Sequence, residues 1–540
     1  MPGADLLVQT LAAAGVKRIF SLSGNQIMPI YDACLNAEIE IVHTRHEAAA
    51  VFMAESYAQL TGDVAVALVT AGAGAANTLG ALFTCSESQT PVLLLTGDAP
   101  RDLDGRGAFQ ELDQVSMTGP VTKLSFRPKR SHELGIDVAR AIRTAKSGRQ
   151  GPVHMALPFD LINGDAAGGP VPNANAFARE RAPLAVGDIR LIAQTLAVAK
   201  RPLILCGPAF NDTRSTCRLD ALRAAFDVPV VAMESPRGLN DPALGNFAEA
   251  LGQADVIVTL GKRIDFTLAF GACGPFTPTC RWIVVEPDAD ERSRAHLHLG
   301  KRLAACLAAD PRDIIDDLIA TAQDPAREPE WPAQVAALTA ARTRSNSNSD
   351  HAAGGKITPA QLCAAVQRQL GKAAKSVIVC DGGEFGQWAQ ASTQADKRII
   401  NGMAGTIGGG ICYGLSAKMA EPDATVFALM GDGTVGFHLA EFETAARTNT
   451  PFVVVIGNDQ RWNAEHQIQM RDYGPDRLIG CELSNARYDQ AAQGLGGHGE
   501  YVTDLADLDA ALDRAVNSGK VACVNVVIEG LPAPKGTSTG

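Results

Sequence analysis

An aspartate between two glycines ends one apolar run of the chain, and an asparagine ends the next apolar run. Asp432 lies in MGDG after the run VFAL, and Asn458 follows FVVVIG. Carboxylate and amide oxygens are ligands that Mg²⁺ prefers, and the flanking glycines let the backbone approach a phosphate closely. The pattern predicts a divalent ion and a diphosphate at one edge of a parallel sheet. The alternative is a turn after one strand and an ordinary loop after the other.

A second candidate is Glu47, in IVHTRHEAAAVFMAESYAQLTG, at the start of a small-residue helix that follows a strand. One interpretation is a simple charge at a helix N-terminus, worth about 0.3–1 kcal/mol. The other is a carboxyl group kept protonated by apolar surroundings, which the stretch AAAVFMAE offers. The Gly-rich segments TAGAGAANTLGAL, CDGGEFGQW and GMAGTIGGG are either ligand-binding turns or plain turns between elements.

The elements that must position these residues alternate between short apolar strands and helices. RIFSL, IEIVHT, VAVALVT, PVLLLTG and GPVHMALP form a first set, and RPLILC, VPVVAM, ADVIVTLG and RWIVVEPD a second. SVIVC, VFALMG, PFVVVIGN and ACVNVVIE form a third set. Continuously apolar strands alternating with helices indicate doubly wound parallel sheets. We therefore predict an α/β protein of three domains, at 1–165, 184–330 and 357–540.

The boundaries of these domains are predicted from composition. Residues 163–183 include GDAAGGPVPNANAF and lack helical periodicity, which is typical of a linker. Residues 324–356 include the polar stretch RTRSNSNSDHAAGG after a short predicted helix. The tail LPAPKGTSTG is predicted to be loose or a lid.

Composition excludes several classes of function. The 540 residues carry a net charge of −11 without a basic stripe, which argues against a nucleic-acid partner. No run approaches about 20 uninterrupted apolar residues, so we expect no membrane span. The N-terminus lacks a signal-peptide pattern, and a cytoplasmic location is the default expectation. The twelve cysteines are scattered, and most are expected to be buried thiols.

Taken together, the motifs resemble the thiamin-diphosphate enzymes of the acetolactate synthase, 2-hydroxyacyl-CoA lyase and oxalyl-CoA decarboxylase branch. The resemblance spans nearly the whole chain and rests on GDG followed by Asn458, on the helix that begins at Glu47, and on GRGAFQELDQV and GMAGTIGGG. It implies a pyrimidine-binding domain, a central nucleotide-type domain and a diphosphate-binding domain, in that order. It also implies thiamin diphosphate and Mg²⁺ as cofactors.

The resemblance implies a role for each residue in these motifs. Glu47 would bind the aminopyrimidine ring and drive the imino tautomer, while Gln110 and Asn463 would face the reacting carbon. Mg²⁺ would be held by Asp432, Asn458 and the backbone carbonyl of Gln460. The residues implied to bind the cofactor are Glu47, Gly383, Glu384, Phe385, Gly405, Ile407, Gly431, Asp432, Gly433, Thr434 and Asn458.

Some positions depart from the pattern of the family. Gly457 and Asn458 stand where two asparagines are usual, and the second is the implied ligand. Ile407 replaces the usual methionine as the wedge that bends the cofactor, and Gly405 would supply the carbonyl to its amine. In the central domain, Arg263 is a candidate for a phosphate and Glu286 or Asp288 for a ribose. ADP or FAD is possible there, and the absence of an LGMHG stretch makes FAD the weaker expectation.

We expect a carboligase or decarboxylase of small 2-oxo acids that works through a C2 carbanion and an enamine. The alternative is a 2-hydroxyacyl-CoA lyase that joins formyl-CoA to aldehydes or cleaves 2-hydroxyacyl-CoA. A further alternative, of another class, is a non-catalytic, cofactor-binding regulatory subunit. Because Glu47 and Asp432 lie in different domains, the resemblance implies a homo-oligomer, a dimer or tetramer, with active sites at the subunit interface.

Overall fold

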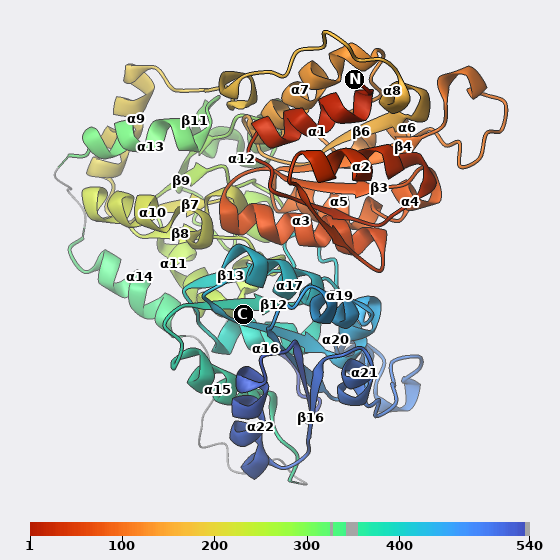
Figure 1. The fold of residues 1–540 in the computed structure, drawn as a ribbon. Helices are drawn as coiled ribbons and strands as arrows, with labels where there is room; N and C mark the ends of the chain where they lie inside the picture. The colour runs from red at the N-terminus through yellow and green to blue at the C-terminus, as the bar shows by residue number, and fades with distance from the viewer. Residues whose placement is uncertain (324–327, 342–354, 535–540) are drawn as a thin grey trace.

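The computed structural model describes residues 1–323, 328–341 and 355–534. Within these residues the chain forms three sheets, and every strand pair in them is parallel. Figure 1 shows them as three layered units, with the red and orange N-terminal unit beside the yellow and green central unit and the blue C-terminal unit below. The prediction of three parallel-sheet α/β domains is confirmed.

The first sheet has the strand order β2-β1-β3-β4-β6-β5. Its strands are β1 (Arg18–Ser21), β2 (Glu40–His43), β3 (Ala65–Val69), β4 (Val92–Asp98), β5 (Leu124–Phe126) and β6 (Val153–Pro158). The helices around it are α1 (Gly3–Ala13), α2 (Met28–Asn36), α3 (Glu47–Thr61), α4 (Ala73–Ala76), α5 (Leu79–Glu87), α6 (Gln114–Thr118), α7 (Leu134–Lys146) and α8 (Phe159–Asn163).

The central sheet has the order β11-β10-β9-β7-β8. Its strands are β7 (Pro202–Cys206), β8 (Val230–Ala232), β9 (Val256–Leu260), β10 (Arg281–Val285) and β11 (Leu303–Leu307). Its helices are α9 (Val186–Val198), α10 (Asp212–Phe226), α11 (Phe247–Gln253), α12 (Ala289–Leu299), α13 (Pro311–Ala320) and α14 (Trp331–Ala340).

The third sheet has the order β13-β12-β14-β15-β17-β16. Its strands are β12 (Ser376–Cys380), β13 (Lys397–Ile400), β14 (Thr425–Gly431), β15 (Val453–Asn458), β16 (His498–Val502) and β17 (Ala522–Val527). Its helices are α15 (Pro359–Leu370), α16 (Gly383–Ser392), α17 (Gly410–Ala420), α18 (Asp432–Val435), α19 (Glu441–Arg447), α20 (Asn463–Asp472), α21 (Tyr488–Gly494) and α22 (Leu505–Asn517).

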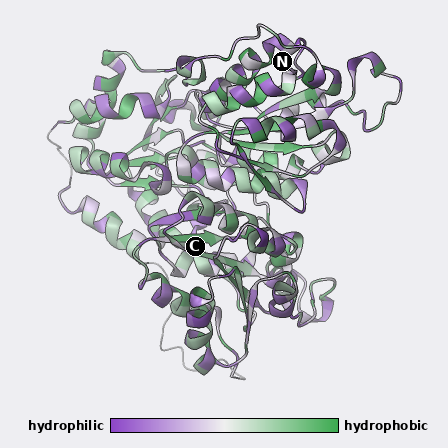
Figure 2. Cartoon of the chain, in the orientation of Figure 1, coloured by the Kyte–Doolittle hydropathy of each residue, from purple (hydrophilic) through white to green (hydrophobic). Residues whose placement is uncertain are grey.

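The core lies on both faces of each sheet, as the continuously apolar strands require. Every residue of β3, β4 and β12 is buried, and the strands are mostly green in Figure 2 while purple residues mark the outer helix faces. All twelve cysteines are free thiols and nine of them are buried, which confirms that prediction. In the part of the chain that the structure describes, no helix has both the length and the apolar character to cross a membrane.

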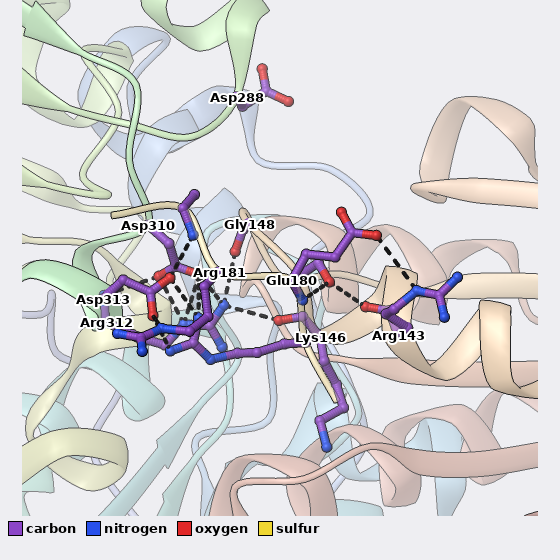
Figure 3. A network of polar contacts seen from close by, with 12 residues as sticks. Arg143, Lys146, Gly148, Glu180, Arg181, Asp288, Asp310, Arg312 and Asp313 are labelled. Atoms are coloured by element: carbon purple, nitrogen blue, oxygen red, sulfur yellow. Dashed lines mark hydrogen bonds and ion pairs between the residues drawn. The ribbon is translucent and has the colours of Figure 1, made fainter. Parts of the chain in front are cut away.

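The segment predicted as the first linker contacts both the first domain and the central domain. Phe177 packs in the core beneath the first sheet, and a few residues later Arg179 pairs with Asp313 of the central domain at 2.6 Å. Figure 3 shows Arg181 at the same aspartate and Arg312 reaching the backbone carbonyls of Lys146 and Gly148 in the first domain. These contacts fix the central domain against the first. The predicted polar boundary at 342–354 and the end of the tail at 535–540 lie outside the described residues.

A second junction joins the first and third domains through α3 and α17. Glu55, in the middle of α3, is fully buried, and its carboxyl accepts hydrogen bonds from Tyr413 at 2.7 Å and Ser88 at 2.6 Å. Arg214 of the central domain donates to the backbone carbonyl of Ser88 and to Thr90 beside it. Burial raises the pKa of Glu55 to about 7, although the bonds from Ser88 and Tyr413 act in the opposite direction.

This carboxyl group predicts a pH dependence of stability. Glu55 titrates near its ordinary value in the unfolded chain and near 7 in the folded one, so the folded state holds more protons between these pH values. Stability from this group is therefore full at acidic pH and lost as the pH rises towards 7. Relative to wild type, Glu55→Gln should become progressively more stable from pH 5 to pH 8, measured as the thermal unfolding midpoint. Glu38→Gln, at an exposed position, is the control, and a constant difference across this range would contradict the prediction.

Candidate functional site

The predicted metal ligands lie side by side at the carboxyl edge of the third sheet. Gly431 at the end of β14 pairs in parallel register with Gly457 of β15. The next residues along the two strands are Asp432 and Asn458, which are 1 % and 0 % exposed. Asn458 is further held by β17, because its side-chain NH₂ donates to Asn525 at 3.1 Å. The register of two strands therefore brings a carboxylate and an amide to one point, as the sequence predicts.

Both side chains keep one oxygen without a hydrogen-bond partner. Asp432 Oδ2 and Asn458 Oδ1 are buried and unsatisfied among the described residues. A buried unpaired oxygen costs about 1–3 kcal/mol, so its presence in a native site needs an explanation such as an ion. An octahedral Mg²⁺ that accepts carboxylate and amide oxygens fits these two atoms. Within the described residues no group of three or more His, Cys, Asp or Glu side chains could hold a metal. Further ligands at this point would be other oxygens, such as the predicted carbonyl of Gln460 or a diphosphate.

A second carboxyl group, which the sequence reasoning missed, lies beside Asp432. Asp459 is buried, and its carboxyl group interacts electrostatically with that of Asp432. Burial, and then the neighbouring Asp459 carboxylate, raise the pKa of Asp432 well above its ordinary value. Burial also raises the pKa of Asp459, against the opposing effect of Arg461. Two buried carboxyls this close favour sharing a proton, and a divalent cation that binds here would displace that proton.

A cavity of about 200 Å³ opens beside these ligands. Helix α16 begins there at Gly383, whose φ of +82° favours glycine, so its first N–H groups border the space. Such N–H groups suit a phosphate. The predicted residues that line the cavity are Gly383, Glu384, Phe385, Gly405, Ile407, Gly431, Asp432, Gly433, Thr434 and Asn463.

The packing around the cavity explains Gly457, the departure from the usual pair of asparagines. A Cβ atom at Gly457 would lie 2.5 Å from the ring of Phe385. Real Cβ atoms never come this close to a ring, so Phe385 and a side chain at position 457 exclude each other. The glycine therefore makes room for Phe385 and leaves Asn458 as the amide at this strand end.

The segment from Gly405 to Gly410 is held by another buried acid, Asp381, at the end of β12. Its carboxylate accepts N–H groups of Gly408 at 3.0 Å and Gly410 at 3.2 Å. Burial raises the pKa of Asp381 to about 6, although these N–H groups act in the opposite direction. Ile407 lies against Gly382, where a Cβ would be 2.5 Å from its side chain. The predicted wedge residue is thus fixed on the wall of the cavity.

Helix α20 forms another wall and carries Asn463. The indole of Trp462, at its N-cap, packs on Gly433, where a Cβ would be 2.7 Å from the ring. The side chain of Asn463 donates to the carbonyl of Leu531 at 3.1 Å and accepts from Gln467. Asn463 therefore lines the cavity while its amide is bound to the segment that follows β17.

Gln460, the third predicted metal ligand, has a left-handed backbone with φ of +64°. Its carbonyl accepts the N–H of Leu483 at 2.7 Å. A carbonyl has two lone pairs, so this bond leaves one available. Gln460 and Asn458 do not line the cavity itself.

Glu47 and Gln110 lie together on the first domain. Glu47 is the first residue of α3, half-buried, and accepts a hydrogen bond from Asn77 at 3.0 Å. A Cβ at Gly74 would be 3.5 Å from its carboxylate, and one at Gly72 would be 2.7 Å from the carbonyl of Gln110. The turn at 70–74 therefore joins both predicted residues at the carboxyl edge of the first sheet.

Gln110 itself sits in the loop between β4 and α6, which projects from the body of the chain (Figure 1). Its φ is +61°. Glu111 organises the loop by accepting the N–H groups of Gly107 and Ala108 at 2.9 and 3.0 Å. Phe109, the residue before Gln110, is 76 % exposed.

No described residue of the first domain lines the cavity that holds Asp432. The structure thus brings the predicted residues together as two groups, one around Glu47 and one around Asp432. It adds three residues that the sequence reasoning left out. Asp381 and Asp459 each follow a buried strand, which was a usable signal, whereas Arg237 comes from the central domain and nothing in its local sequence marks it.

The crevice at the carboxyl edge of the central sheet does not fit FAD or ADP in this arrangement. The space between the ends of β7, β9 and β10 has a volume of about 20 Å³. Arg149 of the first domain enters it and pairs with Glu286 at 3.5 Å. Arg263, the predicted phosphate ligand, pairs with Glu87, and Asp288 caps α12. The three residues predicted to bind a nucleotide therefore all make contacts within the chain instead.

Three descriptions of protein families match these domains in order. "Thiamine pyrophosphate enzyme, N-terminal TPP binding domain" matches residues 1–117, the central domain of the same family matches 189–318, and its C-terminal TPP binding domain matches 381–526. The chain belongs to the thiamine pyrophosphate enzyme family. The predictions of this family, and of a thiamin-diphosphate-dependent enzyme of carbon–carbon bond chemistry, are confirmed.

The similar proteins include acetolactate synthases and 2-hydroxyacyl-CoA lyases. A probable acetolactate synthase of Mycobacterium bovis is 32 % identical, over 98 % of this chain and 96 % of its own. The human 2-hydroxyacyl-CoA lyase 2 is 31 % identical, over 92 % of this chain and 84 % of its own. The large subunit of acetolactate synthase isozyme 2 of Escherichia coli is 27 % identical, over 98 % and 96 %.

The unpaired oxygens predict that Asp432 is needed for Mg²⁺-dependent uptake of thiamin diphosphate. Asp432→Asn should weaken that uptake by at least about 100-fold, because even indirect partners of a metal are worth 10- to 100-fold. Calorimetric titration of thiamin diphosphate in the presence of Mg²⁺ measures the change. Asp423→Asn, at the exposed opposite end of β14, is the matched control. Equal affinity of the Asp432→Asn and control variants would contradict this assignment.

Proposed function

We propose that the protein is a Mg²⁺- and thiamin-diphosphate-dependent carboligase or decarboxylase of small 2-oxo acids. The observation that carries the proposal is the pair of unpaired buried oxygens on Asp432 and Asn458 beside a cavity bordered by helix N–H groups. Thiamin diphosphate, when bound, supplies an electron sink for breaking or forming the bond next to a carbonyl carbon. The likeness to acetolactate synthases supports 2-oxo acids as substrates.

Different residues of the chain would bind the metal, bind and orient the cofactor, and transfer the proton. Asp432, Asn458 and the carbonyl of Gln460 would hold Mg²⁺, and the N–H groups at Gly383 and Glu384 would bind the diphosphate oxygens. Gly405 and Ile407 would orient the cofactor, and Trp462 and Asn463 would close the cavity against water. Glu47 would hold the proton that the aminopyrimidine ring needs, and Gln110 would position the substrate.

The proposal requires at least a dimer. Glu47 does not line the cavity of its own chain, yet both groups must reach one cofactor. A second subunit that offers its Glu47 and Gln110 to this cavity would complete the site. The projecting loop exposes Phe109 and Leu112 on either side of Gln110, and exposed apolar side chains that lie together are typical of an interface.

A 2-hydroxyacyl-CoA lyase is the second candidate. One observation favours it: the human lyase, at 31 % identity, is about as similar to this chain as the acetolactate synthases, at 32 % and 27 %. A non-catalytic, cofactor-binding subunit is the weakest candidate, because Glu47 and the metal ligands are all present.

The experiment is a comparison of substrates on the holoenzyme loaded with Mg²⁺ and thiamin diphosphate. Pyruvate alone tests the first candidate, with acetolactate as the product. Formyl-CoA with an aldehyde tests the second, with a 2-hydroxyacyl-CoA as the product. Absence of turnover with every substrate, while the cofactor still binds, would support the non-catalytic alternative.

Glu47→Gln should lower kcat about 10²- to 10⁴-fold, the usual worth of a positioned proton-transfer group. Binding of Mg²⁺ and thiamin diphosphate should remain, because the metal ligands lie elsewhere. Glu38→Gln is the control for a charge lost outside the site. If the rate of Glu47→Gln stays within a few-fold of wild type, the role given to Glu47 is wrong.

A further inference from the structure

The central domain contributes a residue to the cavity around Asp432. Arg237 follows β8 and lines this cavity together with residues of the third domain. Its side chain is exposed. In residues 1–323, 328–341 and 355–534 its guanidinium makes no ion pair and no hydrogen bond; only its backbone N–H is bound, to Ser235 at 3.2 Å.

The backbone of this loop is fixed. Gly238 donates its N–H to the carbonyl of Ser235 at 3.1 Å, and Asn240 donates to that of Arg237 at 3.0 Å. Gly238 has a φ of +53°, and a Cβ there would lie 2.1 Å from the carbonyl oxygen of Thr267. The short helix η8 (Pro242–Leu244) then packs against α16. The loop thus holds Arg237 at the rim of the cavity while its side chain stays free to move.

The guanidinium of Arg237 is one of few positive charges at a mainly acidic cavity. Four acidic residues, Glu384, Asp432, Asp459 and Glu465, line the cavity together with only two basic ones, Arg237 and Arg461. Arg461 is engaged, because it donates to the carbonyl of Asp459 at 3.2 Å and shares a hydrogen bond with His466 at 3.1 Å. Of the two basic residues, only Arg237 has a guanidinium without a hydrogen bond or ion pair among the described residues, so it is the one available to receive an anion.

The position of Arg237 separates it from the cofactor-binding groups. The metal ligands and the N–H groups of α16 all come from the third domain, and Asp432 and Asn458 are fully buried. Arg237 is exposed and comes from another domain. A guanidinium binds a carboxylate or a phosphate through two parallel hydrogen bonds.

We propose that Arg237 is a specificity residue that binds the anionic group of the substrate. This inference rests on the proposed function. The anion is the carboxylate of a 2-oxo acid for the first candidate function and a phosphate of the CoA moiety for the second. The same guanidinium can bind a carboxylate or a phosphate, so the identity of the substrate determines which of the two anions it binds.

The test compares Arg237→Ala, Arg237→Lys and a control, Arg190→Ala, in holoenzyme loaded with Mg²⁺ and thiamin diphosphate. Arg190 is an exposed residue of α9 that does not line the cavity. Arg237→Ala should raise KM for the anionic substrate about tenfold or more, the worth of hydrogen bonds to a charged group. KM for a neutral aldehyde and the affinity for thiamin diphosphate should stay within about twofold. Lysine should restore part of the loss, since it keeps the charge without the planar fork.

Two arms distinguish the source of the anion. A raised KM for pyruvate, with weaker binding of the anionic pyruvate analogue methyl acetylphosphonate, supports a carboxylate. Weaker binding of free CoA, with unchanged binding of pantetheine, which lacks the phosphates, supports a phosphate. Unchanged constants for both anions overturn the proposal. It is also overturned if the affinity for thiamin diphosphate falls by the same factor, because Arg237 would then serve the cofactor.

These binding measurements separate this inference from the proposed function. If the wild type turns over none of the substrates, the proposed function fails. Arg237 is then judged by calorimetric binding of methyl acetylphosphonate and CoA alone. Weaker binding by Arg237→Ala than by Arg190→Ala supports its role, and equal binding refutes it.

Discussion

The parallel register of β14 and β15 is the constraint on which the site depends. Gly431 pairs with Gly457, so the following residues present Asp432 and Asn458 at one point of the sheet edge. Both are buried with an oxygen unpaired, an arrangement that is unfavourable without an ion. The surrounding residues hold the two side chains in place. Phe385 occupies the space that Gly457 leaves, and Trp462 covers the turn at Gly433. Asn525 orients the amide of Asn458. The two strand ends thus leave two buried oxygens available to a ligand.

The second constraint is the division of the site between domains. The α3–α17 contact and the buried Glu55–Tyr413 bond fix the first domain on the third within one chain, and Glu47 begins the same α3. Its carboxylate is nevertheless not part of the cavity around Asp432. A rigid intrachain junction of this kind cannot close the gap by domain movement without breaking a buried polar network. The fixed junction, together with the projecting loop at Gln110, supports assembly as the way to complete the site.

The sequence predicted the inner strands of the sheets and the edge strands β2 and β8, and missed the other four edge strands. β5, β11, β13 and β16 each end a sheet order, and most of their residues are only partly buried. An edge strand needs no continuous apolar run, so it carries little signal. The same reasoning applies to the site. Asp432, Asn458 and Glu47 follow apolar strands and could be predicted, whereas Arg237 reaches the cavity only through the packing of η8 on α16, which no local pattern encodes.

The central domain has the sheet of a nucleotide-binding domain, but side chains occupy the crevice at its strand ends. Its sheet has the strand-end glycines Gly207 and Gly261 at the place where a nucleotide could bind, yet Arg149 fills the crevice and pairs with Glu286. The ion pair of Arg263 with Glu87 and the hydrogen bonds from Arg312 to the carbonyls of Lys146 and Gly148 bind it further to the first domain. A domain anchored in this way gives the loop at 235–241 a fixed base. Because that base is rigid, the central domain places the guanidinium of Arg237 beside the cavity that Asp432 of another domain lines. Under the proposal made above, this is how the domain would influence the choice of substrate.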